Sequence, residues 1–144
     1  MFNFVLNKYK ERKQKKDKKI INLREYPPKI ILAWAKGADN NSEFLDYLYN
    51  NGYKELVMTI HSYYHKKEAK EWLMDNGFPH FLALVNASEG NEDALNWLKK
   101  NEFILFYNMA LAIDGDNTGF EWLKSNSTKE FYYLTLNLKT LKLS

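Results

Sequence analysis

A tryptophan-leucine pair returns every 25 residues in this chain. The pair stands at 72–73, 97–98 and 122–123, and Tyr47-Leu48 occupies the same place one interval earlier. A short fixed period is typical of repeat proteins, in which each unit buries its apolar face against its neighbours. The period therefore predicts a stack of similar units, and it favours a binding surface over a catalytic site.

Other positions repeat in the same register and indicate the form of each unit. Asparagine stands four residues after each aromatic residue, a large apolar residue nine after it, and a small residue ten before it. The position seven before it holds Asn40, His65, Gly90 and Gly115, of which three suit a turn. Each unit therefore reads as two short helices. The first carries the aromatic residue, and the second is more apolar and is expected to be buried.

Two domains are predicted on this basis. Residues 1–26 form a basic N-terminal helix, spanning about 3–26, which Pro27 and Pro28 end because proline has no N–H to donate. Residues 27–144 form the repeat array, with units near 27–40, 41–65, 66–90, 91–115 and 116–144. The fold class is therefore all-α, a solenoid of helical hairpins.

The last unit is ambiguous in sequence. Leu134, Leu136 and Leu138 alternate with polar residues, which is a strand period, whereas the repeat register predicts a helix. We predict a helix. A polar cap, which terminal repeats normally need, is not evident at the end of the sequence. The next aromatic position would fall at 147, so the array either stops here or is part of a longer one.

Charge is divided unevenly along the chain. Residues 1–19 have a net charge of +6, and the remaining residues have −3. Such a basic segment can bind the phosphates of a nucleic acid or an anionic membrane surface, although charged runs are usually solvated. The eight cations of this segment, residues 8–19, are Lys8, Lys10, Arg12, Lys13, Lys15, Lys16, Lys18 and Lys19.

Several classes of function receive no support from the sequence. The chain has no cysteine, which excludes a disulfide framework, a thiolate zinc site and a cysteine nucleophile, and which fits a cytoplasmic protein. It has no G-x-S-x-G, P-loop or G-x-G-x-x-G motif. We therefore expect no enzyme, no cofactor and no small-molecule ligand.

Two short segments resemble metal sites and are better explained otherwise. His61 and His65 have the i, i+4 spacing of zinc ligands, but a zinc site needs at least three protein ligands. Residues 114–119 begin like an EF-hand loop, but Ser125 stands where a bidentate glutamate is required. We expect no metal, and we interpret residues 114–119 as the turn between two helices.

The residues of one unit resemble an ankyrin repeat, which reads roughly A-A-x-x-G-x-x-E-V-V-x-L-L-L-x-x-G. Residues 87–101 follow that line from Ala87 through Gly90 to Trp97-Leu98, and residues 112–126 follow it again. Ankyrin units are ~33 residues long, and these are about eight shorter and lack the T-P-L-H tetrapeptide. Over about 37–137, the resemblance implies a helix-turn-helix solenoid without the β-hairpin finger. Short HEAT-like repeats are an alternative family.

The function we expect is protein binding through one face of the solenoid, as a scaffold, adaptor or inhibitor. Its contact residues should vary between units while the frame stays fixed. Because many of them are acidic, the partner is expected to carry a basic patch. The candidates are Asp46, Glu71, Asn96 and Glu121 before each aromatic residue, and Asp39, Asn40, Glu89, Asn91, Asp114 and Asp116 at the turns. The tryptophans are expected in the core, so that Trp97→Ala should cost ~3–5 kcal/mol.

Overall fold

A computed structural model describes residues 26–144 of this chain. The predicted N-terminal helix and the basic segment 8–19 lie outside the described residues. Within 26–144 the chain is all-helical and has no strand, and helices adjacent in sequence pack against one another. The predicted fold class, an all-α helical repeat, is therefore confirmed.

The described residues contain nine helices, joined by short turns. They are α2 (Pro28–Ala38), α3 (Ser42–Asn50), α4 (Lys54–Tyr63), α5 (Lys67–Asp75), α6 (Pro79–Ser88), α7 (Glu92–Lys100), α8 (Ile104–Ile113), α9 (Asn117–Asn126) and α10 (Lys129–Leu143). The last unit is thus helical, as its register predicts, despite the alternating leucines.

The repeated polar residues set the ends of these helices. At the turn position, Asn40, His65, Gly90 and Gly115 all have left-handed backbone, with φ between 59° and 99°. The four repeated asparagines each donate their Nδ2 hydrogen to the carbonyl of the aromatic residue four positions earlier, at 2.7–3.1 Å. These side-chain bonds supplement the sparse backbone bonding at a helix end, where the Trp72 and Trp97 carbonyls also accept the backbone N–H of the same asparagine. The sequence period is therefore largely a period of helix ends.

The small position allows close packing between helices. Gly37, Ser62, Ala87 and Ala112 are all buried near the ends of their helices. In the last unit α9 approaches α8 closely, since a Cβ added to Gly119 on α9 would collide with the carbonyl oxygen of Asn108 on α8. Backbone contact of this kind requires glycine.

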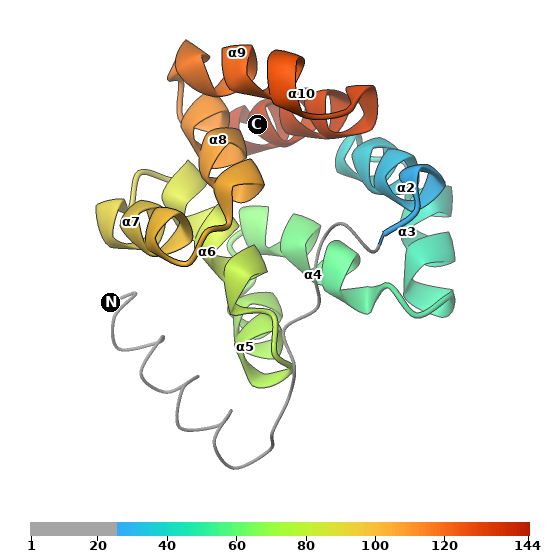
Figure 1. Cartoon of the computed structure of the whole chain (residues 1–144). Coiled ribbons are helices and arrows are strands. Elements are labelled where there is room, and N and C mark those ends of the chain that lie inside the picture. The colour runs from blue at the N-terminus through green and yellow to red at the C-terminus, as the bar shows by residue number, and fades with distance from the viewer. Residues whose placement is uncertain (1–25) are drawn as a thin grey trace.

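The helices divide into an outer set, α3, α5, α7 and α9, and an inner set, α2, α4, α6, α8 and α10 (Figure 1). Of each repeated pair on the outer helices, the leucine is fully buried and the aromatic residue is not. Leu48, Leu73, Leu98 and Leu123 have 0% exposure, whereas the three tryptophans are half-buried and Tyr47 is 44% exposed. The tryptophans thus pack against the core, as expected, but at its edge, because an outer helix turns only its innermost side toward the inner layer.

The inner helices close into a ring. In Figure 1, α10 lies beside α2, and the Nδ2 of Asn137 donates a 2.8 Å hydrogen bond to the carbonyl of Ala35. Trp34 of α2 is fully buried and reaches across the ring to Phe81 of α6 and Phe106 of α8, with ring centroids 5.7 and 6.5 Å apart. The α10 and α2 helices thus cover each other's apolar faces.

Candidate interaction surfaces

Closure of the ring decides which surfaces a partner can reach. The inner layer is filled by apolar side chains from α2, α4, α6, α8 and α10, including Trp34, Phe81 and Phe106. A concave groove along the inner helices, which an open solenoid would offer, is therefore occupied by core. The surfaces that remain accessible are the outer helices, the turns at the two ends of the ring, and parts of the inner helices such as Leu32 and Leu136.

The candidates on the outer helices are all exposed but are not gathered together. Asp46, Glu71, Asn96 and Glu121 lie one on each of α3, α5, α7 and α9. Figure 1 shows these four helices on different sides of the ring. The four side chains are therefore spread around its periphery rather than placed on one face.

The turns after α6 and α8 bring two of the acidic candidates close together. Glu89 and Asp114 are both exposed, and a Cβ added to Gly90 would lie 3.9 Å from Asp114 Oδ2. Each carboxylate also has an ion pair within the chain. Lys70 Nζ lies 3.9 Å from Glu89 Oε1, and Lys142 Nζ lies 2.9 Å from Asp114 Oδ1. Two neighbouring turns thus form one acidic surface.

Two further turn candidates cap helices. Asn91 Oδ1 accepts a 2.9 Å hydrogen bond from the backbone N–H of Ala94, at the start of α7. Asp116 Oδ1 accepts from the hydroxyl and the backbone N–H of Thr118, at 2.6 and 3.0 Å, at the start of α9. These bonds, the side-chain one foremost, lower the pKa of the Asp116 carboxyl. Both residues therefore have a structural role as helix N-caps.

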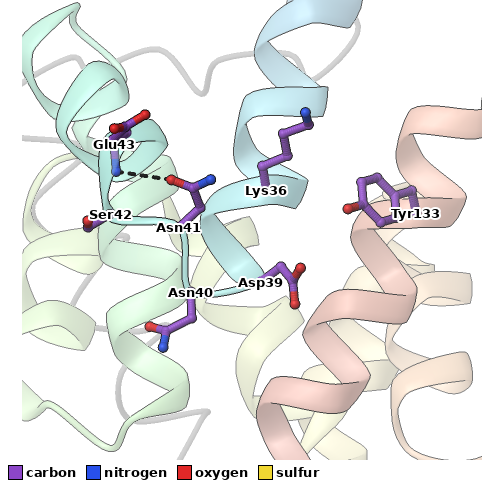
Figure 2. A pocket seen from close by; sticks show the side chains of 7 residues that line it. All are labelled: Lys36, Asp39, Asn40, Asn41, Ser42, Glu43 and Tyr133. Atoms are coloured by element: carbon purple, nitrogen blue, oxygen red, sulfur yellow. Dashed lines mark hydrogen bonds between the residues drawn. The ribbon is translucent and has the colours of Figure 1, made fainter.

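Asp39 and Asn40 lie elsewhere, in the turn between α2 and α3. They line a polar hollow of about 620 Å³ together with Lys36 of α2 and Tyr133 of α10, as Figure 2 shows. Nearby, Asn41 Oδ1 accepts a 3.2 Å hydrogen bond from the Glu43 N–H, which caps α3. Sequence reasoning missed Tyr133 here, because only the packing of α10 on α2 brings it to this turn.

The segments that resemble metal sites are parts of helices and turns. Among residues 26–144, no group of three or more His, Asp or Glu side chains could hold a metal ion. Asp114 follows α8 and Asp116 caps α9, so residues 114–116 are an inter-helix turn, as predicted, whereas residues 117–119 form the first turn of α9 rather than part of the inter-helix turn. His65 occupies a left-handed turn position, and burial followed by the charge of Lys66 lowers the pKa of His61. In the same part of the chain, no helix is long and apolar enough to cross a membrane.

Comparison with protein-family models, curated proteins and solved structures found no match to this chain. The ankyrin-like resemblance therefore rests on the residues of the repeat alone.

Proposed function

We propose that this chain is a protein-interaction module that binds a basic patch of another protein through the acidic turns after α6 and α8. The observation that supports the proposal is the closeness of these two turns, since a Cβ added to Gly90, the residue after Glu89, would lie 3.9 Å from Asp114 Oδ2, and Glu89 and Asp114 are both exposed. Glu92, Asp93 and Asp116 add three exposed carboxylates within the same turns and the first turn of α7.

The two ion pairs at this surface do not prevent such binding. Exposed ion pairs contribute only about 0–1 kcal/mol, because water and salt screen them. An arginine on a partner, with its planar fork of donors, binds a carboxylate in a bidentate manner that a lysine cannot match. Complementary charge also raises association rates, so binding should weaken with added salt.

A pair of triple variants tests this surface. Glu89→Gln, Asp114→Asn and Asp116→Asn together remove three negative charges and leave an asparagine cap at the start of α9. A matched control, Asp46→Asn, Glu71→Gln and Glu121→Gln, removes three charges from the outer helices.

The readout is capture of proteins from lysate of the source organism, followed by affinity measurement with the captured partner. We expect the turn variant to lose the partner and the outer-helix variant to retain it. Equal affinity of both variants and the unaltered chain would rule out the acidic turns.

A second candidate function rests on the basic segment 8–19. Its eight cations within twelve residues match what phosphate binding to a nucleic acid or an anionic membrane requires. Deletion of residues 1–19 separates the two candidates. If the full chain captures only nucleic acid or lipid, with a steep salt dependence, and the deleted chain captures nothing, the function belongs to the basic segment.

The proposal also includes the family of the repeat and the cellular compartment of the protein. We regard the unit as a shortened ankyrin-like hairpin without a finger, which the left-handed glycines at 90 and 115 and the helix pairs support. A role in binding rather than catalysis, in the cytoplasm, is supported by the cysteine-free sequence and the lack of catalytic motifs.

A further inference from the structure

Two of the three outer-helix tryptophans are covered by a phenylalanine six residues later. Trp72 stacks on Phe78 with centroids 5.8 Å apart and planes at 10°, and Trp97 stacks on Phe103 at 5.6 Å and 13°. The next unit breaks this pattern. Trp122 is followed at the same interval by Thr128, which has no ring to place there.

The register shows where the missing ring would lie. Phe103 is held between two rings, since it also stacks on His80 at 5.0 Å and 17°. One period of 25 residues carries Trp97 to Trp122, His80 to Leu105 and Phe103 to Thr128. The missing ring would therefore lie against Trp122 and Leu105.

A hollow of about 330 Å³ lies at this place. Trp122, Leu105 and Thr128 all line it, and Phe103 and Phe131 line it as well. Its volume is at the lower end of the range for ligand sites, and its lining is mostly apolar with a few polar groups, as such sites usually are. Glu102 is the sole charged residue among those that line it.

We propose that this hollow is a binding site for one uncharged aromatic ring, which stacks on Trp122 as Phe78 and Phe103 stack on their tryptophans. Its occupant is an aromatic side chain of a partner protein, because phenylalanine side chains fill the equivalent positions of the two preceding units. A free aromatic compound is the other source that the test distinguishes. The site is independent of the acidic turns, because it is formed by the turns that follow the outer helices α7 and α9, not those that follow α6 and α8.

Two probes distinguish the two sources of the ring. Indole represents a free aromatic compound, and N-acetylphenylalanine amide represents a side chain with its backbone. Each is titrated into the ¹⁵N-labelled full chain while the indole N–H signals are followed by NMR. The Trp122 signal should shift with saturation, and the Trp72 and Trp97 signals should not, because their faces are already covered by phenylalanine.

Substitution of Thr128 provides the decisive control. Thr128→Phe restores the ring that the other units have, and it should weaken binding of either probe at least about tenfold. Thr128 Oγ1 also accepts the N–H of Phe131 at 3.4 Å, so Thr128→Ser keeps both the cap and the hollow and should bind as the unaltered chain does. If Thr128→Phe does not fold, Leu105→Phe narrows the hollow from its other side.

Binding of N-acetylphenylalanine amide, with or without binding of indole, supports a side chain as the occupant. Binding of indole alone would overturn that occupant and assign the site to free compounds. A Trp122 signal that neither probe shifts, or binding that Thr128→Phe leaves unchanged, would overturn it. Because no acidic turn takes part, failure here leaves the proposed protein-binding surface untouched.

Discussion

Replacing Trp34 by alanine should destabilise the protein by about 4 kcal/mol. Trp34 has 0% exposure and joins α2 to α6 and α8 through Phe81 and Phe106. A buried tryptophan removes roughly 150–250 Å² from water, which at about 25 cal/mol per Å² corresponds to roughly 4–6 kcal/mol. Measured truncations of core Phe or Trp to alanine, at roughly 3–5 kcal/mol, agree with this value.

A milder substitution separates packing from hydrogen bonding at the same position. Among the described residues, Trp34 Nε1 has no hydrogen-bond partner, and an unsatisfied buried donor costs about 1–3 kcal/mol. Trp34→Phe removes that donor and keeps an aromatic ring in the centre. We therefore expect Trp34→Phe to cost less than about 2 kcal/mol, well below the alanine variant.

Urea unfolding followed by far-ultraviolet circular dichroism measures these effects without relying on tryptophan fluorescence. Leu32→Ala is the matched control, because Leu32 lies on the same helix and is 39% exposed. It should cost less than about 1 kcal/mol, since much of the leucine is already in water. If Trp34→Ala cost no more than Leu32→Ala, with equal m-values, Trp34 would not occupy the centre and the closed ring would be wrong.

Further substitutions test the packing, the turns and one histidine. Gly119→Ala should cost about 1–3 kcal/mol, because its Cβ meets the backbone of α8. Leu98→Ala should cost about 2–5 kcal/mol, and more than Trp97→Ala, because Leu98 is the fully buried member of the pair. His65→Gly should stabilise by about 0.5–1 kcal/mol, since left-handed backbone disfavours a side chain by more than glycine loses in chain entropy. Burial lowers the pKa of His61 below its ordinary 6.5, so the neutral imidazole contributes stability that is complete above pH 6.5 and is lost as the pH falls. Between pH 7 and 5, the His61→Gln variant should therefore lose less stability than the unaltered chain.

Equilibrium unfolding in urea measures these four effects. The first three are read from urea midpoints at pH 7, and the histidine effect from midpoints across the pH range. A neutral Gly119→Ala would mean that α8 and α9 are farther apart than the structure has them. Destabilisation by His65→Gly would contradict the left-handed turn, and equal pH slopes would mean that His61 titrates alike in the folded and unfolded chains.

The local structure could be predicted from the sequence because each repeated residue has a local cause. Asn40 and Gly90 adopt left-handed backbone where the register predicts a turn, and Asn91 caps α7 as its position before an acidic first turn indicates. The helical final unit follows from the same register. Such features depend on neighbours within one or two turns of helix, which a single unit contains.

Closure of the ring could not be predicted in this way. The hydrogen bond between Asn137 and Ala35 joins residues 102 positions apart, and it depends on small rotations accumulated over every unit between them. Nothing in the 25-residue period specifies that sum. The hollow at Tyr133 and Asp39 depends on the same closure, so the sequence gives no signal for it either.

The repeat pattern also could not predict how deeply each residue of the outer helices is buried. A tryptophan and a leucine side by side on a helix share an apolar face, and sequence alone does not say which of them is innermost. The structure places Leu98 at 0% exposure and leaves Trp97 half-buried against Phe103. By contrast, the hollow beside Thr128 had a signal, since threonine interrupts a register of aromatic residues at that position.

The closed ring is the claim on which the choice of interaction surfaces depends, and nuclear Overhauser contacts measure it directly. In the full chain, a closed ring should give cross-peaks from the side-chain amide of Asn137 to protons of α2 near Ala35, and from the Trp34 ring to the rings of Phe81 and Phe106. Cross-peaks confined to adjacent units, with none between α10 and α2, would show an open array and would contradict it.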